Sequence, residues 1–136
     1  MRISIDFDGT IVEHRYPEIG KERPFAVKTI KQLAADGHQL ILNTVREGEL
    51  LDAAVEWCEK RGVVFYAVNQ NTPDETYESP GYTRKILADY YIDDRNIGGL
   101  PDWETIYEII STGKTFEDFL RQEAGLPAKK KPWWKF

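Results

Sequence analysis

The stretch Met1-Arg-Ile-Ser-Ile-Asp-Phe-Asp-Gly-Thr10 organises the fold that we expect for this chain. Ile3 and Ile5 alternate with polar neighbours, which predicts a short strand that ends in a sharp glycine turn. The carboxylates of Asp6 and Asp8 would then lie at the carboxyl end of the strand, where open α/β sheets bind ligands. Two like charges this close are costly unless a cation neutralises them, and hard oxygen ligands of this kind suit Mg²⁺.

Length and composition indicate one globular domain. The chain has 136 residues, 41% of them hydrophobic and 30% charged, which is enough to bury a core. A net charge of −5 argues against a general grip on nucleic-acid phosphates. The single cysteine, Cys58, excludes an internal disulfide framework. Because Cys58 falls on an apolar helical stripe, we interpret it as a small buried hydrophobic residue rather than a nucleophile.

The sequence also makes predictions about membrane spans, localisation and the C-terminal tail. No apolar run approaches the ~20 residues that span a bilayer, and a strand that begins at residue 2 leaves no room for a signal peptide. We therefore expect a cytoplasmic protein with one domain over residues 1–124 and a tail over 125–136. The basic and aromatic residues of the tail could touch a membrane surface, a partner or a neighbouring subunit, or could fray or pack on the domain itself.

The rest of the chain alternates predicted helices and strands. Alternation of this kind implies right-handed crossovers and an α/β fold, a Rossmann-like doubly wound parallel sheet with helices on both faces. Residues 11–23 are polar and predict an excursion or short hairpin over the Asp6 edge, and residues 69–82 predict a loop. The expected strands are 39–44, 63–68 and 90–92, and the expected helices are Pro24–Gly37 (apolar stripe Val27, Ile30, Leu33, Ala34), about 51–62 (Leu51, Ala54, Val55, Cys58), 102–111 and 115–123, with 83–89 undecided between a helix and a turn.

Polar residues mark the ends of three predicted strands. Asp6 and Asp8 follow the first strand, Thr44 ends the second, and Asp93 and Asp94 follow the fourth. Lys85 lies just ahead of the fourth. In a parallel sheet these ends converge on one edge, so distant segments would bring carboxylates, a hydroxyl and an ammonium to one pocket. This set suits phosphoryl transfer, in which catalysis is mostly positioning and neutralisation of negative charge.

Each group has a chemical use in such a reaction. A metal bound by Asp6, Asp93 and a backbone carbonyl would shield an anionic phosphate from an anionic nucleophile. Lys85 would add a second positive charge. Thr44 and the backbone N–H groups after Asp6, including that of Gly9, would donate hydrogen bonds to the remaining phosphate oxygens.

The whole pattern resembles the haloacid dehalogenase-like (HAD) superfamily of phosphoryl-transfer enzymes over about residues 1–100. Motif I corresponds to residues 6–10, motif II to residues 40–44, motif III to Lys85 and motif IV to residues 91–94. Motifs I and IV are specific. Motifs II and III are weak alone but occur in the right order.

The resemblance implies a Mg²⁺-dependent phosphatase with assigned residue roles. Asp6 would attack phosphorus and form an aspartyl phosphate, and Asp8 would protonate the leaving group and then activate water. Asp6, the main-chain carbonyl of Asp8 and Asp93 would hold Mg²⁺, with Asp94 as a further or water-mediated ligand. Family members with a non-acidic residue at the place of Asp8 are typically dehalogenases or ATPases, so the acid favours a phosphatase or phosphomutase.

The intervals after motif I and between motifs II and III are too short for a folded cap domain, so the chain resembles the capless type. An open pocket admits a large phosphorylated substrate, or a small one if a second subunit closes it in a homo-oligomer. The substrate itself is not readable from the sequence.

Several residues keep a second interpretation. Arg46 could reach a substrate anion, as a substrate-binding residue beside Gly9, or could pair with a neighbouring glutamate. Arg84 could act in place of Lys85. The remaining alternatives are that Thr44 only ends a strand, that Asp94 only caps a turn, and that His14 and Arg15 are solvated rather than in contact with substrate.

Two other functions compete with the phosphatase. A degenerate HAD-like domain could bind metal and a phosphorylated ligand without turnover. A receiver domain also uses Asp, Mg²⁺, Thr and Lys, but there the acidic pair follows the first strand and the acceptor Asp ends a central one. The order of the acidic segments in this chain argues against a receiver.

Overall fold

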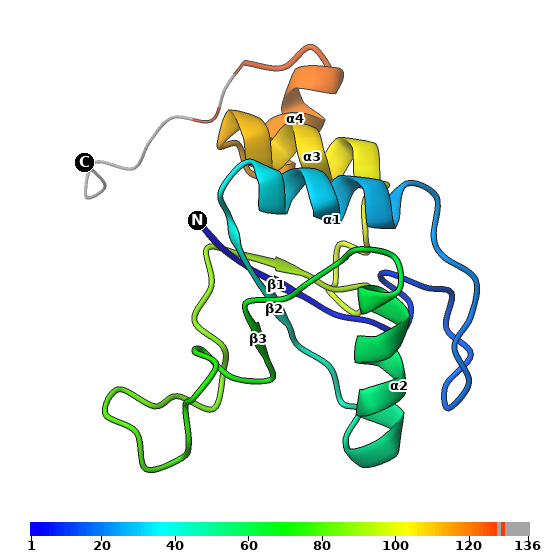
Figure 1. Ribbon diagram of the computed structural model, residues 1–136. Coiled ribbons are helices and arrows are strands. Elements are labelled where there is room, and N and C mark those ends of the chain that lie inside the picture. The colour runs from blue at the N-terminus through cyan, green and yellow to red at the C-terminus, as the bar shows by residue number, and fades with distance from the viewer. Residues whose placement is uncertain (128, 130–136) are drawn as a thin grey trace. The chain divides into compact units, whose positions relative to one another are not determined.

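The fold is α/β with a four-stranded, all-parallel sheet in the order β3-β2-β1-β4. The computed structural model describes residues 1–127 and 129 (Figure 1). The strands are β1 (Arg2–Ile5), β2 (Gln39–Leu42), β3 (Ala67–Val68) and β4 (Tyr90–Ile92).

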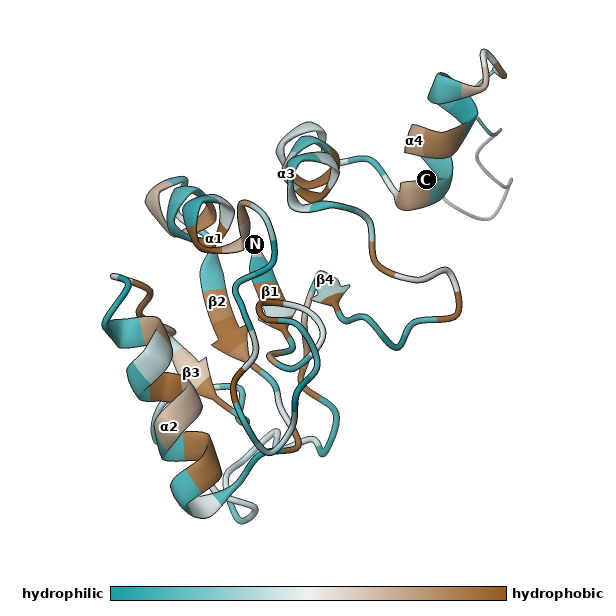
Figure 2. Cartoon of the chain, turned by 90° about the vertical axis from the view of Figure 1, so that its right-hand side faces the viewer, coloured by the Kyte–Doolittle hydropathy of each residue, from teal (hydrophilic) through white to brown (hydrophobic). Residues whose placement is uncertain are grey.

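Strand β1 lies between β2 and β4, and most of its residues are buried. Ile3 pairs with Leu40 of β2 on one side and with Tyr90 of β4 on the other. Ile3 and Ile5 are fully buried, and most of β2 is likewise apolar and buried (Figure 2). The backbone N–H of Asp6 still donates to Ile92 O at 2.9 Å, so the chain leaves β1 beside the end of β4.

Two helices connect β1, β2 and β3. Helix α1 (Ala26–Ala35) joins β1 to β2, and α2 (Gly48–Glu59) joins β2 to β3. The expected apolar stripe of α1 is partly wrong, because Ala34 is exposed. The buried face runs at helical spacing from the first residue of the helix and consists of Ala26, Thr29, Ile30 and Leu33.

Cys58 is buried on the inner side of α2, as expected. Burial raises the pKa of its thiol to about 12, against the lowering effect of the Arg61 charge and with a smaller raising effect of Glu59. A thiol in that state is inert at neutral pH, which agrees with a packing role.

The third strand is much shorter than the predicted 63–68. The backbone N–H of Val63 donates to Cys58 O at 3.0 Å, and Gly62 has a φ of +81°. Both features close the end of α2, so Val63 belongs to the helix-ending turn and pairing with β2 is confined to the last residues of the predicted run. Residues 69–89, between β3 and β4, contain no helix, so the undecided segment 83–89 is irregular.

The flap, defined as residues 11–23, is the hairpin-like excursion expected after β1. Its arms are joined by hydrogen bonds from Glu13 N to Lys21 O and from Arg23 N to Ile11 O, both 2.8 Å long. The flap is therefore an ordered two-armed segment rather than a loose connection.

The chain divides into two compact units, Met1–Trp103 and Glu104–Phe136. The second contains most of α3 (Trp103–Thr112) and all of α4 (Phe116–Glu123), which begins with a capping box between Thr115 and Asp118. Among the described residues no helix is both long enough and apolar enough to cross a membrane. The predicted roles of the tail fall largely on residues 128 and 130–136, which lie outside the described residues.

Candidate metal-binding and catalytic site

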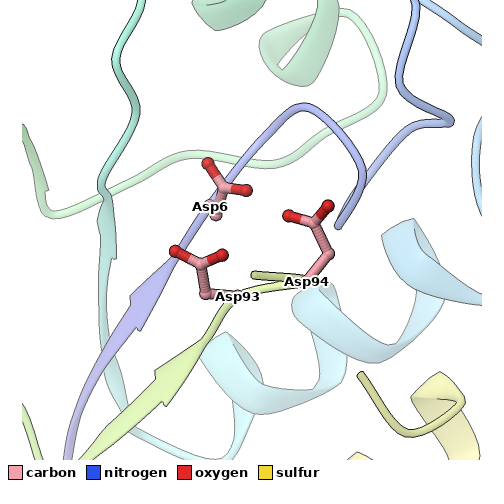
Figure 3. Close-up of side chains that lie close together, drawn as sticks. All are labelled: Asp6, Asp93 and Asp94. Carbon is pink, nitrogen blue, oxygen red and sulfur yellow. The ribbon is translucent and has the colours of Figure 1, made fainter. Parts of the chain in front are cut away.

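Three carboxylates from two strand ends form the acidic cluster, defined as Asp6, Asp93 and Asp94. Asp6 follows β1, and Asp93 and Asp94 follow the neighbouring strand β4 (Figure 3). One carboxylate oxygen of each residue lies within 4.8 Å of those of the other two. Parallel pairing of β1 with β4 explains the convergence, because it brings both strand ends to the same edge.

The cluster carries more negative charge than its surroundings compensate. Burial, a hydrogen bond shared with Asp94 and the charge of Asp93 together raise the pKa of Asp6 from its ordinary 3.8 to about 7. Hydrogen bonds from the Phe7 backbone and the Thr10 hydroxyl act in the opposite direction and do not overcome them. An added cation would favour the ionised carboxylate.

Thr10 holds the two halves of the cluster together. Its hydroxyl is within hydrogen-bonding reach of Asp6 Oδ2 at 3.1 Å and Asp94 Oδ1 at 3.3 Å. Its oxygen accepts a hydrogen bond from the backbone N–H of Asp94 at 3.1 Å. The indole Nε1–H of the buried Trp103 donates to Thr10 O at 3.0 Å, so the turn that carries Thr10 is itself anchored.

Gly9 fits this turn for two reasons. Its φ is +83°, a conformation that side chains rarely adopt, and a Cβ at this position would meet Asp94 Oδ2 at 2.2 Å. The glycine therefore lets the turn after β1 pass directly against the cluster.

The Asp8 side chain lies apart from the cluster, in a buried ion pair with Arg46. Arg46 Nε donates to Asp8 Oδ2 at 2.7 Å, and Arg46 Nη2 donates to Asp8 Oδ1 at 2.8 Å. The exposed fractions of the two side chains are 8% for Asp8 and 0% for Arg46. The hydrogen bond from Arg46 to Asp8 raises the pKa of the guanidinium above its already high ordinary value.

Arg46 also donates to two backbone carbonyls. Nη2 donates to Glu18 O in the flap at 3.0 Å, and Nη1 donates to Leu50 O in α2 at 3.3 Å. Its guanidinium carbon lies 5.2 Å from the ring centre of Tyr16 and 5.3 Å from that of Phe7. The predicted pairing with a neighbouring glutamate is therefore replaced by a pairing with Asp8 across the fold.

The described contacts of Thr44 and Lys85 are with residues outside the acidic cluster. The Thr44 hydroxyl accepts a hydrogen bond from Arg46 N at 3.1 Å, and Thr44 N donates to Asn69 Oδ1 at 2.8 Å. Lys85 Nζ lies 4.7 Å over the ring centre of Tyr91 in β4. Within residues 1–127 and 129, no ion pair joins Lys85 to a carboxylate.

Other predicted positions are exposed or serve the local backbone. His14, Arg15 and Arg84 are exposed. Asp93, rather than Asp94, supports the turn after β4, because Asp93 Oδ1 accepts a hydrogen bond from Arg95 N at 2.8 Å.

Sequence reasoning missed the residues that support the site through space. Thr10 has a signal, since it follows Asp6 by one tight turn. Trp103 and Asn69 have none, because each reaches the site from a distant segment through side-chain hydrogen bonds to the backbone. The partnership of Arg46 with Asp8 joins residues 38 positions apart in the sequence, and no local pattern indicates it.

The acidic cluster fits a hard divalent cation. It offers several carboxylate oxygens at one sheet edge, the donor type that Mg²⁺ prefers. The raised pKa of Asp6, which burial and then its acidic neighbours cause, means that a bound cation would favour its ionised form.

One solved structure is similar to this chain over most of both lengths. It is described as the structure of a conserved protein from Bacteroides thetaiotaomicron, with 60% sequence identity and a TM-score of 0.82. The match covers 88% of this chain and 96% of that one. No protein-family model and no curated protein matches the sequence.

Proposed function

We propose that this chain, which belongs to the same family as the Bacteroides thetaiotaomicron conserved protein, is a Mg²⁺-dependent phosphomonoester hydrolase. The observation that carries the proposal is the convergence of Asp6, from the end of the central strand, with Asp93 and Asp94, from the end of its neighbour. A nucleophilic carboxylate needs both fixed orientation and nearby positive charge to approach a phosphate dianion.

The reaction has two displacement steps at phosphorus. An Asp6 oxygen forms a bond to phosphorus while the bond to the ester oxygen breaks, and the leaving oxygen takes a proton from Asp8. Water then attacks the aspartyl phosphate, giving one proton to Asp8 and releasing inorganic phosphate and the free Asp6 carboxylate. The proton on Asp8 is restored, so the cycle consumes one ester and one water.

The chain's own residues prepare Asp6 for this role. Thr10 orients the carboxylate through its hydroxyl, and the turn at Gly9 keeps the adjacent backbone close to the cluster. Mg²⁺ held by Asp6, Asp93 and Asp94 would supply the positive charge that lets the nucleophile and the phosphate approach each other. Lys85 and Thr44 remain proposed phosphate ligands. Lys85 Nζ lies over the Tyr91 ring, and the Thr44 hydroxyl accepts a hydrogen bond from Arg46 N.

The HAD-like, doubly wound and capless arrangement is part of the same proposal. The chain moves outward from β1 to β2 and β3 and then returns to β4 on the other side of β1. Such a reversal beside β1 is the switch point at which open parallel sheets bind ligands. The flap and residues 69–89, the two intervals where a cap would be inserted, contain no helix.

One observation favours a second function, a non-catalytic domain that binds metal and a phosphorylated ligand. Both oxygens of Asp8 accept hydrogen bonds from Arg46, which holds the side chain in an ion pair away from the acidic cluster. If Asp8 does not exchange a proton with substrate, the acidic cluster could bind a metal and a phosphate without turnover.

The deciding experiment is hydrolysis of a generic aryl phosphate with Mg²⁺ and with a chelator. We expect Mg²⁺-dependent turnover in the wild type, a loss of at least about 10³-fold in Asp6→Asn, and no change in Asp52→Asn. Asp52 is a suitable control because it is an exposed aspartate on α2 outside the cluster. Full activity in Asp6→Asn would refute the nucleophile, and binding of Mg²⁺ and phosphate without turnover across a panel of esters would favour the binding domain.

A further inference from the structure

Arg46 contacts Asp8 and the flap with the same guanidinium nitrogen. Nη2 donates one hydrogen to Asp8 Oδ1 at 2.8 Å and the other to Glu18 O at 3.0 Å. The ring of Tyr16, also in the flap, lies against the guanidinium. A movement of the flap therefore changes the surroundings of the group that holds Asp8.

The energetics of a buried ion pair make this connection consequential. The Arg46 side chain is fully buried, and a buried cation is tolerated only while its charge and its N–H donors are satisfied. Lifting the flap removes the Glu18 acceptor and the Tyr16 ring and lets water reach the guanidinium. The effective dielectric then rises, and the attraction between Arg46 and Asp8 weakens.

The connection also acts in the reverse direction. If a neutral side chain replaces Asp8, Arg46 becomes a buried cation without a counter-ion, and its hydration through an open flap becomes favourable. An effect of the flap on Asp8 thus requires an equal effect of Asp8 on the flap.

We propose that Arg46 is a positioning residue that couples the flap to Asp8. With the flap down, Arg46 holds both Asp8 oxygens. A leaving group that displaces the flap loosens this ion pair and lets the Asp8 side chain turn towards the bound ester. The coupling itself stands on the contacts of Arg46, whereas its catalytic consequence rests on the proposed hydrolase function.

A glutamate-specific protease tests the coupling without any enzymatic activity. The bond after Glu18 contains the carbonyl that Arg46 holds, so it is protected while the flap is down. The bond after Glu56, inside α2, serves as an internal reference, because it becomes accessible only when the helix itself opens. The measured quantity is the ratio of the two cleavage rates.

We expect Asp8→Asn to raise this ratio at least about tenfold, although Asp8 lies outside the flap. Tyr16→Ala should also raise it, and the double variant should exceed the larger single effect by less than about twofold, because both changes act through Arg46. Asp52→Asn, an exposed charge removal on α2, should leave the ratio unchanged. A ratio in Asp8→Asn within about twofold of wild type, or single effects that multiply in the double variant, would overturn the coupling.

Global destabilisation also raises the rate of cleavage after Glu56, the reference bond. Flap opening raises only the rate of cleavage after Glu18, so the ratio of the two rates separates the two effects. Tyr16→Ala provides a second safeguard, because Tyr16 is exposed and its removal takes away neither of the two charged groups.

A kinetic measurement tests the catalytic consequence. For a small aryl phosphate, which cannot push the flap aside, Tyr16→Ala should raise kcat about threefold and change KM by less than about twofold. A lower kcat would show that the closed flap positions Asp8 productively and would overturn the release step. Absence of turnover in every variant would remove the hydrolase proposal, while the cleavage ratios would still decide the coupling.

Discussion

Asp6 and Asp8 lie two residues apart on the same turn, yet the fold treats their charges in opposite ways. Asp6 lies beside Asp93 and Asp94, and burial together with these acids raises its pKa to about 7. Asp8 is more deeply buried but has a complete counter-ion in Arg46, which donates to both of its oxygens. One carboxylate lies among like charges, and the other has a counter-ion within the chain.

Under the proposed function, this difference distinguishes Asp6, which would bind a cation, from Asp8, whose charge is already neutralised. A charge that the protein already neutralises contributes to the packed structure, and removing its partner is expensive. A charge that the protein leaves uncompensated lowers stability until something positive binds, which is the usual condition of a binding site. Substitutions at the two places should therefore have opposite effects.

The largest effect should follow from Arg46→Met, which leaves Asp8 buried without its partner. We expect a loss of about 3–5 kcal/mol in the free energy of unfolding, measured by urea denaturation. Lys60→Met removes an exposed partner of Glu56 and should cost less than about 1 kcal/mol. Similar losses in the two variants would mean that the internal counter-ion of Asp8 is no more important than a surface pair.

Gly9→Ala should have the next largest effect, because it forces the turn away from the cluster. The left-handed backbone costs about 1–2 kcal/mol and the displacement of Asp94 a further 1–3 kcal/mol or so. Gly37→Ala is the matched control, since its φ is +94° but no atom lies within 4 Å of the added Cβ. Gly9→Ala should also weaken Mg²⁺ binding, measured by calorimetry. If Gly9→Ala and Gly37→Ala lost the same stability and bound Mg²⁺ equally, backbone strain alone would explain both losses.

The smallest effect should be the pH dependence that comes from Asp6. Its pKa is about 7 in the folded chain and near the ordinary 3.8 when unfolded, so the folded state binds the extra proton between these values. Its contribution to stability is therefore present at low pH and is lost as the pH rises through about 7.

With a chelator, the free energy of unfolding of the wild type should fall between about pH 5 and pH 8 more than that of Asp6→Asn. At pH 8 the variant should be the more stable, by on the order of 1 kcal/mol after allowance for screening of a half-buried group. Mg²⁺ should reverse that order, because it stabilises only a protein that binds it. Parallel pH curves for the two proteins would show that the cluster is not short of positive charge.

The sequence alone predicts the parts of the fold that depend on local pattern. Alternating and continuous apolar residues predict β1, β2 and β4, and the helical spacing around Ile30 and Leu33 predicts α1. The position of Asp6, Asp93 and Asp94 at strand ends also follows from the sequence, because a parallel sheet brings all such ends to one edge. Element ends are less predictable, as Val63 illustrates by closing a helix instead of beginning a strand.

Only the tertiary structure decides which partner each charged group receives. From the sequence, only a family resemblance gives Asp6 and Asp8 different roles, and Arg46 is a basic residue with glutamate neighbours. The fold brings Arg46 from beyond β2 to Asp8 and brings Asp93 and Asp94 from beyond β4 to Asp6. The physical reason is that strand patterns are set by burial along a short segment, whereas the state of a charge depends on burial and on every neighbour within a few ångströms, whatever its place in the chain.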